Sequence, residues 1–379
     1  VVGMMVDQMR WDYMYRFQNR YTEGGFKRLL HEGFSCENTM IDYSPTITTC
    51  GHTCVYTGSV PAIHGIVGND WYDREKGKDI GCVDDESTQL VGSGESATGQ
   101  SPHNNLATTI TDQLRIASNY QSKTVGVAIK DRASILPAGH AATAAFWFNG
   151  KDGHFVTSTY YMNELPDWAK RFNDKKVVDS YLDKDWETLY PVSTYTLSTA
   201  DDKSYEGTAN GEARPVFPHK LKQFKGKNYG AIRTTPHGNT ITFDFAKAAI
   251  EGYDLGGGSF TDFLAISFSS PDAIGHTYGP NSIEIEDNYL RLDKELADFF
   301  TYLDKRFGKG NYLYFITADH GVSESPGFYL ENKMPSGAIE SKDFSQAVEN
   351  GLKEKYGVEK PVLSFANYQL YMNWEAFDK

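Results

Sequence analysis

The chain has 379 residues, of which 40% are hydrophobic and 23% are charged, and its formal net charge is −13. This length and composition are typical of a globular protein with one large α/β domain and an insertion. The negative charge argues against a nucleic-acid-binding surface, because phosphate backbones require clustered Lys and Arg. No apolar run reaches the roughly 18 residues of a membrane-spanning helix, so we also expect no membrane span.

The first strand of the chain ends in a carboxylate. Residues 1–6 form a short apolar run, and Asp7 follows directly. A single Asp at this position is most often the cap of a following helix, so Asp7 alone identifies no site. Residues 21–31 have the apolar spacing of a helix that ends near Gly33.

The four cysteines, Cys36, Cys50, Cys54 and Cys82, all lie in the first quarter of the chain. They lack the spacing of a zinc ribbon. Two of them lie four residues apart on an expected helix, where small buried side chains are the simpler interpretation. A disulfide between Cys36 and Cys82 remains an alternative if the protein is exported.

Residues 44–73 are rich in hydroxyl side chains. Thr46, Thr48 and Thr49 are natural caps for a short helix expected from about residue 50 to residue 56, with its end at Gly58. A hydroxyl at a helix N-terminus faces free backbone N–H groups, which suits a bound phosphate or sulfate. A well-capped helix without a ligand is the alternative interpretation.

Two cations follow the next expected strand. Residues 106–117 predict an amphipathic helix and residues 124–129 a strand, after which come Lys130 and Arg132. Two cations at a strand end suit the binding of an oxyanion. A solvated charged loop is the alternative.

Residues 141–239 differ from the rest of the chain in their high content of aromatic side chains. No alternation of strands and helices is visible, although residues 149–153 predict a turn between two strands. We therefore expect an inserted cap at 141–239 and an α/β core formed by residues 1–140 and 240–379.

The strand pattern returns at residues 263–268, and Asp272 and His276 follow it. If a helical turn contains both, they share one face and can reach one metal ion. Residues 283–307 predict a long helix with acidic residues in its first turn.

A last buried strand is expected within residues 312–321. Its apolar run suits a strand buried on both faces, and it ends in Asp319 and His320, with Gly321 freeing the backbone to turn. Residues 344–356 then predict a helix, and residues 361–372 are strand-like.

Three strand ends thus carry ligands that zinc accepts: Asp7, Asp272 with His276, and Asp319 with His320. The carboxyl ends of parallel strands meet at one edge of a sheet, which is where open α/β sheets place their sites. Three carboxylates brought together would repel one another without cations. Two zinc ions are the economical prediction.

The residues between 48 and 69 carry a family resemblance. They read Thr48-x-x-Gly-His52, then Tyr56-Thr57-Gly58, His64-Gly65 and Gly68-Asn69. With the metal motifs at 272–276 and 317–321, this pattern resembles the alkaline phosphatase superfamily, and within it the threonine-nucleophile PafA-type alkaline phosphatases. Type I phosphodiesterases and nucleotide pyrophosphatases are relatives. The resemblance implies a three-layer α/β sandwich, with a mostly parallel central sheet, helices on both faces and an inserted cap.

The resemblance also implies a role for each motif residue. Thr48 is the expected nucleophile and a ligand of one zinc, together with Asp7, Asp319 and His320, while Asp272 and His276 hold the second zinc. Asn69, Lys130 and Arg132 are expected to bind phosphate oxygens. The chain departs from the family in one respect: no histidine follows His320, so the second zinc lacks its third protein ligand. We therefore expect the chain to be incomplete at its C-terminus.

The expected function is that of a zinc-dependent phosphate monoester hydrolase acting on phosphorylated small molecules, located in the periplasm or secreted after removal of a signal peptide. A phosphodiesterase or nucleotide pyrophosphatase of the same superfamily is one alternative. A truncated, catalytically weak metal-binding remnant is another.

Overall fold

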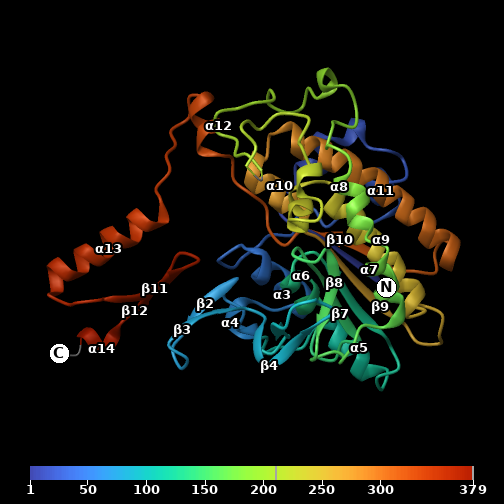
Figure 1. Ribbon diagram of the computed structural model, residues 1–379, viewed down its shortest axis with the longest axis horizontal. Helices are drawn as coiled ribbons and strands as arrows, with labels where there is room; N and C mark the ends of the chain where they lie inside the picture. The colour runs from blue at the N-terminus through green and yellow to red at the C-terminus, as the bar shows by residue number, and fades with distance from the viewer. Residues whose placement is uncertain (210, 378–379) are drawn as a thin grey trace.

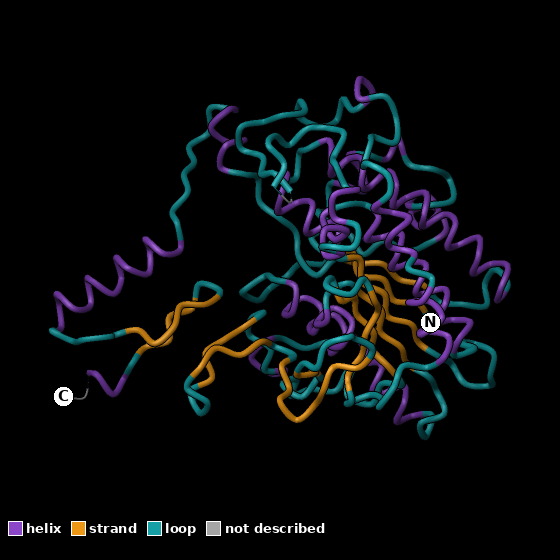
Figure 2. Tube along the Cα trace, in the orientation of Figure 1, coloured by secondary structure: helices purple, strands orange, loops and turns teal. Residues whose placement is uncertain are grey.

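The computed structural model describes residues 1–209 and 211–377 and is built on a central eight-stranded sheet (Figures 1 and 2). The strand order is β10-β1-β9-β6-β7-β8-β4-β5, and the five strands from β10 to β7 pair in parallel. The strands are β1 (Val2–Val6), β4 (Asp84–Val91), β5 (Thr98–Gln100), β6 (Thr124–Ala128), β7 (Ala144–Asn149), β8 (His154–Ser158), β9 (Phe263–Phe268) and β10 (Tyr314–Thr317).

Helices cover both faces of this sheet (Figure 1). Along β1, Met4 and Val6 enter the larger core cluster, which includes residues of α9 (His237–Gly252) and α11 (Ile283–Phe307). Met5 points to the other face, where it packs with Tyr56 of α3 (Thr48–Thr57). This alternation is the two-residue period of a strand. The predicted three-layer fold with a mostly parallel sheet is confirmed.

The other elements are shorter or lie at the rim. The helices are α1 (Tyr13–Arg16), α2 (Phe26–Glu32), α4 (Pro61–His64), α5 (Ile110–Ala117), α6 (Asp131–Ala138), α7 (Asp167–Asp174), α8 (Val177–Leu182), α10 (Ser270–Tyr278), α12 (Pro326–Glu331), α13 (Ser341–Tyr356) and α14 (Trp374–Phe377). Single turns of 3-10 helix lie at Gln18–Arg20, Val192–Thr194 and Lys222–Phe224, and a longer one at Tyr229–Thr234. Two hairpins pair β2 (Asp70–Asp73) with β3 (Lys78–Gly81), and β11 (Val362–Ala366) with β12 (Gln369–Met372).

The last strand of the sheet differs from its prediction. β10 is an edge strand that pairs only with β1, and its residues are half-buried, whereas burial on both faces was expected. An apolar run can also occur in an edge strand when its aromatic rings pack on neighbouring side chains. Here Tyr314 packs on Phe300 with ring centroids 4.6 Å apart. Leu313 from the same run is 65% exposed.

The start of the predicted cap region belongs to the sheet. β7 and β8 lie within residues 141–239, but β7 pairs in parallel with β6 and β8 closes an antiparallel hairpin on β7. The turn predicted at residues 149–153 joins them. The high aromatic content and the missing strand–helix alternation predict an insertion, but the alternation is missing at β7 and β8 because a hairpin joins these two strands in place of a helical crossover. Beyond β8, residues 159–236 carry short helices and loops beside α10 and α11, and their status as a separate cap stays a prediction.

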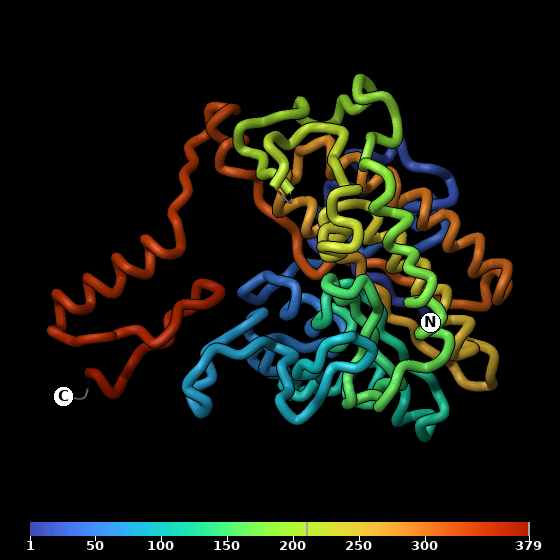
Figure 3. The backbone as a smooth tube through the Cα atoms, viewed as in Figure 1, coloured from blue at the N-terminus to red at the C-terminus, as the bar shows by residue number. Residues whose placement is uncertain are grey.

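The C-terminal segment extends away from the rest of the protein (Figure 3). No residue of α13, which is described over its whole length, is buried, and β11 and β12 are half-buried or exposed. The segment is attached through the β2–β3 region, where the Asn367 side chain donates to the Asp70 carbonyl oxygen at 2.7 Å.

The cysteines carry no disulfide. All four are free thiols, with Cys36 exposed and Cys82 buried, so the alternative of a bridge between them is wrong. Within residues 1–209 and 211–377, no helix combines the length and the apolar character that a membrane crossing requires.

Candidate metal centre

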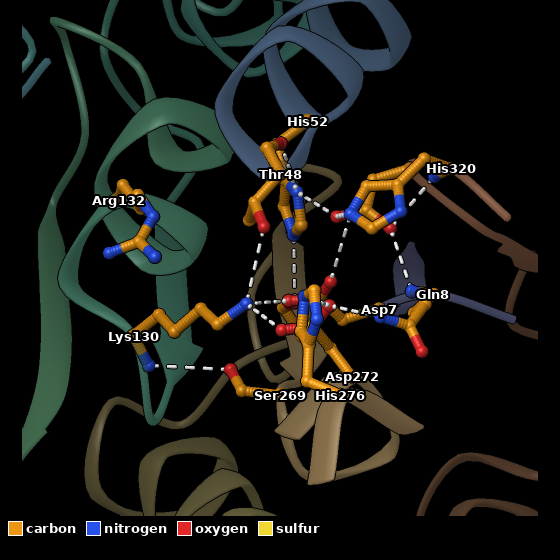
Figure 4. A network of polar contacts seen from close by, with 12 residues as sticks. Asp7, Gln8, Thr48, His52, Lys130, Arg132, Ser269, Asp272, His276 and His320 are labelled. Carbon is orange, nitrogen blue, oxygen red and sulfur yellow. Dashed lines mark hydrogen bonds and ion pairs between the residues drawn. The ribbon is translucent and has the colours of Figure 1, made fainter. Parts of the chain in front are cut away.

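Polar side chains from five segments meet at the carboxyl edge of the parallel strands (Figure 4). This convergence follows from the topology, because β1, β9 and β10 are neighbours and deliver their ends to the same edge. The side chains are Asp7 after β1, Thr48 at the start of α3, Lys130 after β6, Asp272 on α10 after β9, and Asp319 with His320 after β10. All six are buried.

Lys130 lies at the centre of this group. Its Nζ donates to Asp7 Oδ2 at 2.6 Å, to Asp272 Oδ2 at 2.7 Å and to Thr48 Oγ1 at 3.2 Å. Burial alone would lower the pKa of Lys130, but the charges of Asp7 and Asp272 outweigh burial and raise it, so the ammonium stays charged. The alternative of a solvated loop is therefore wrong for Lys130.

The hydroxyl of Thr48 is not used as a helix cap. α3 begins at Thr48 itself, two residues earlier than expected, and its N-cap is Ile47, without a side-chain capping bond. The expected threonine caps are thus wrong. The Thr48 hydroxyl instead points into the polar group, at a helix end whose free N–H groups favour negative charge. The neighbouring Thr49 N–H lies 3.4 Å from Asn69 Oδ1, which brings Asn69 to the same helix end.

His52 of α3 supports the site through contacts to Thr48 and Asp319, a role that the sequence analysis did not assign. Its Nδ1 lies 2.8 Å from the Thr48 carbonyl oxygen and 3.1 Å from Asp319 Oδ2, and its Nε2 lies 2.8 Å from Ser267 Oγ. Gly51 allows this approach, because a Cβ there would lie 2.2 Å from the Asp319 carbonyl oxygen. The Gly-His pair was visible in the motif, but its contact partners were not.

The carboxylates carry more negative charge than the site neutralises. Burial, followed by repulsion from Asp319, raises the pKa of Asp7 to about 7. Asp7 Oδ1 is buried without a hydrogen-bond donor, and Asp319 Oδ2 has the His52 Nδ1 contact at 3.1 Å, a nitrogen that also contacts the Thr48 carbonyl oxygen. Unpaired buried acceptors are costly, so a cation would satisfy both the excess charge and the free oxygen of Asp7.

The donor set fits a metal ion. Ligand atoms of Asp7, Asp272 and His320 lie within 4.8 Å of one another. His320 Nδ1 lies 2.8 Å from the Gly321 carbonyl oxygen, so it carries the proton and leaves Nε2 free as a ligand. Asp272 belongs to the zinc site predicted on Asp272 and His276, whereas Asp7 and His320 belong to the other predicted zinc site. The two predicted sites are therefore adjacent.

His276 lies at the open side of the site. The predicted shared face of Asp272 and His276 is confirmed on α10, with His276 Nε2 3.1 Å from Asp272 Oδ1. The His276 side chain is 69% exposed, whereas that of Asp272 is 8% exposed. Burial would raise the pKa of Asp272, but the hydrogen bond to His276 and the charge of Lys130 hold it below its usual value. The hydrogen bond to Asp272 in turn raises the pKa of His276.

Arg132 and Asn69 lie next to the group without joining it. Figure 4 shows Arg132 to one side of Lys130, with no contact to the carboxylates at the centre. Its Nη1 lies 3.5 Å from Asp131 Oδ1, and its Nε is buried without a partner. Asn69 is half-buried just before β2. Both side chains therefore keep donors available for a ligand.

Known proteins match this chain over most of its length. The family described as type I phosphodiesterase / nucleotide pyrophosphatase matches residues 1–367. A Myroides odoratus protein named calcium-transporting ATPase is 55% identical over 100% of this chain and 70% of its own length. Alkaline phosphatase PhoV of Synechococcus elongatus is 56% identical over 89% of this chain and 62% of its own. Alkaline phosphatase PafA of Elizabethkingia meningoseptica is 51% identical over 98% and 68%.

The structural match is equally close. The crystal structure of wild-type alkaline phosphatase PafA superposes with a TM-score of 0.97 at 50% identity and covers 100% of this chain. A PafA structure with substitutions at a threonine, an asparagine, a lysine and an arginine superposes with a TM-score of 0.95. The present chain spans 62% to 72% of the length of these relatives.

Proposed function

The chain belongs to the type I phosphodiesterase / nucleotide pyrophosphatase family, in its PafA-type alkaline phosphatase branch, and on this premise we propose that it hydrolyses phosphate monoesters through a phosphothreonine intermediate. One observation carries the proposal. The Thr48 hydroxyl lies at a helix N-terminus, 3.2 Å from the buried ammonium of Lys130, which also binds Asp7, a carboxylate with one oxygen that has no partner.

Zinc is the proposed cofactor. Asp7, Asp319, His320 and Thr48 would hold one ion, and Asp272 with His276 a second. Bound there, zinc would lower the pKa of the Thr48 hydroxyl and neutralise charge on the phosphate and the leaving oxygen. The support from this chain is the donor set of carboxylate oxygens and an imidazole nitrogen without thiolates, together with the free Oδ1 of Asp7.

Thr48 carries the covalent chemistry. Its Oγ1 forms a bond to phosphorus as the bond from phosphorus to the alcohol oxygen breaks, and the alcohol leaves. Water then attacks the phosphothreonine, which releases inorganic phosphate and restores the hydroxyl. Lys130 Nζ is already within hydrogen-bond distance of Oγ1 and stabilises negative charge on that oxygen.

Lys130, Arg132 and Asn69 are proposed to hold the non-bridging oxygens of the phosphate. Phosphoryl transfer depends mainly on positioning and charge neutralisation, so cations at these oxygens favour a substrate with two negative charges. The four residues replaced in the substituted PafA structure are a threonine, an asparagine, a lysine and an arginine, which is the order of Thr48, Asn69, Lys130 and Arg132 here. This agreement supports the assignment.

A phosphodiesterase is the second candidate, favoured by the family description itself. The test is hydrolysis of an aryl phosphate against a bis(aryl) phosphate by the full-length protein, with chelator and with added zinc. We expect zinc-dependent turnover and a preference for the monoester. A preference for the diester would support the second candidate, and no turnover with zinc would contradict both. Export to the periplasm or the medium stays a prediction.

A further inference from the structure

Gln8 has an unusual backbone conformation next to a proposed metal ligand. It follows Asp7, its side chain is buried, and its φ is +64°. Residues other than glycine rarely adopt this left-handed region, and a conformation of this kind persists where the surroundings impose it. The contacts of Gln8 provide such surroundings.

The turn at Gln8 lets one residue contact two carboxylates from different strands (Figure 4). Its backbone N–H donates to Asp319 Oδ1 at 3.1 Å, after β10. Its side-chain Nε2 donates to Asp272 Oδ1 at 2.8 Å, on α10. Asp319 belongs to one proposed zinc site and Asp272 to the other, so Gln8 connects the two.

The side-chain oxygen of Gln8 explains why Gly275 lies between the proposed ligands Asp272 and His276 on α10. A Cβ at Gly275 would lie 2.0 Å from Gln8 Oε1, so a side chain there would displace the carboxamide. Gly275 therefore leaves the space that Gln8 fills. The carboxamide is held between α10 and the β1 end, with its amide nitrogen directed at Asp272.

We propose that Gln8 is a positioning residue that sets the relative placement of Asp272 and Asp319 and thereby keeps zinc bound at Asp272 and His276. This inference rests on the proposed function. A carboxamide suits the role because it donates a hydrogen bond without adding a further negative charge to three buried carboxylates. The Asp272 site is the sensitive one, because His276 is mostly exposed and these two residues alone form its proposed ligand set in this chain.

Two substitutions in the full-length protein remove the side-chain contact to Asp272 and keep the backbone contact to Asp319. Gln8→Met keeps the length of the side chain and removes the donor to Asp272. Gln8→Gly removes the same donor, relieves the left-handed backbone and keeps the N–H that contacts Asp319. The matched control is Asn119→Gly, at an exposed position with φ +50° far along the chain from every proposed ligand.

The readout is stepwise zinc binding, measured by competition with a chromogenic chelator. We expect both Gln8 variants to weaken the looser zinc by about 10- to 100-fold, the range for lost outer-shell hydrogen bonds, and to leave the tighter zinc within about threefold. Asn119→Gly should leave both affinities unchanged. Equal weakening of both ions, or no weakening, would overturn the role of Gln8.

A second measurement does not depend on zinc. In chelator, thermal unfolding of Gln8→Met, Asp272→Ala and the double variant forms a double-mutant cycle, and we expect a non-zero coupling between the two positions. Additive effects would overturn the contact. If the wild type binds two zinc ions and Gln8→Met binds them equally well, the inference fails while the proposed function stands. If the wild type binds no zinc although the coupling is present, the proposed function fails together with the inference.

Discussion

Two buried clusters of acidic groups in this protein are satisfied in opposite ways. At the sheet edge, Asp7 and Asp272 share the ammonium of Lys130, with Asp319 close by, and Asp7 Oδ1 has no donor. Between the loops after β8 and the start of α11, His219 lies between Glu212 Oε2 at 2.9 Å and Glu284 Oε1 at 3.2 Å.

This difference distinguishes a candidate metal site, the Asp7 cluster, from a group of charges that stabilises the fold, the His219 cluster. In the His219 cluster every polar group has a partner: both ring nitrogens contact carboxylates, and neither glutamate has an unpartnered buried oxygen. The Asp7 cluster is left with excess negative charge, which destabilises the fold unless a cation binds. Removing charge from the His219 cluster should therefore cost stability, whereas removing groups from the Asp7 cluster should cost activity.

The largest effect is expected from Thr48→Ala. Nucleophile and alkoxide disappear together, so kcat for an aryl phosphate should fall by at least ~10³-fold. Zinc content and melting temperature should stay near those of the wild type, because the carboxylate and histidine ligands remain. Thr46→Ala, at an exposed threonine two residues earlier, is the matched control. An active Thr48→Ala beside an inactive Thr46→Ala or Thr49→Ala would show that the nucleophile is misassigned.

Arg132→Ala should distinguish substrates by charge. Loss of a charged contact from a shielded site removes about 2–4 kcal/mol of transition-state stabilisation, and a diester offers one negative charge fewer. We expect kcat/KM to fall about 30- to 1,000-fold for an aryl phosphate and clearly less for a bis(aryl) phosphate. Equal losses on the two substrates would mean that Arg132 supports the fold instead of binding phosphate.

The His219 cluster should appear in the pH dependence of stability. Burial alone would lower the pKa of His219, but the hydrogen bonds to Glu212 and Glu284 outweigh it and raise the pKa to about 9. The folded-state value lies above the unfolded one, so the stabilisation is complete below about pH 6.5 and is lost as the pH rises through about 9.

Comparison with His219→Gln measures this contribution. The wild type should be more stable by up to about 3 kcal/mol near pH 6, and the gap should narrow by about pH 10. Urea unfolding at several pH values gives the difference, and kcat measured on the folded variant should stay near the wild-type value. A gap that widens with pH would contradict the assigned charge states.

The smallest expected effect, that of Asp7→Asn on the metal-free protein, is a gain in stability instead of a loss. Burial and Asp319 raise the pKa of Asp7 to about 7, so without metal the protein loses stability as the pH rises from about 4, near the ordinary Asp value, to about 7. Asp7→Asn should therefore stabilise the chelator-treated protein by about 1–2 kcal/mol at pH 8 and give little gain at about pH 4. The same variant should lose zinc. A chelated variant less stable than the wild type at pH 8 would show that Lys130 neutralises the cluster fully.

The sequence correctly predicted the bounds of elements whose ends are marked by nearby residues, such as a capping side chain or a glycine. The strand Phe263–Phe268 and the helix Ile283–Phe307 have the predicted bounds. Ser282 caps the helix, its side chain accepting from the Ile285 N–H, and Gly308 ends it with φ +86°. The helix at α5 was predicted too early, because its capping box lies at Thr109 and the apolar pattern starts before it.

Features set by contacts distant in sequence were missed. β10 lies at the sheet edge, and β7 and β8 continue the sheet, because strand neighbours are chosen by the whole topology. The proposed ligand residues could be named from strand ends, since their placement follows from the parallel order. The supporting contacts of Gln8 could not, because they depend on a positive φ and on groups 264 and 311 residues away.

The central claim is that the Thr48 oxygen forms the covalent intermediate. The most direct measurement is acid quenching of the zinc-loaded full-length protein during turnover of an aryl phosphate, followed by peptide mass spectrometry. We predict a phosphoryl group on Thr48 that appears with substrate, is absent without it, and is absent from Thr48→Ala. Full turnover with no phosphorylated peptide, or with the phosphoryl group on another residue, would contradict this mechanism.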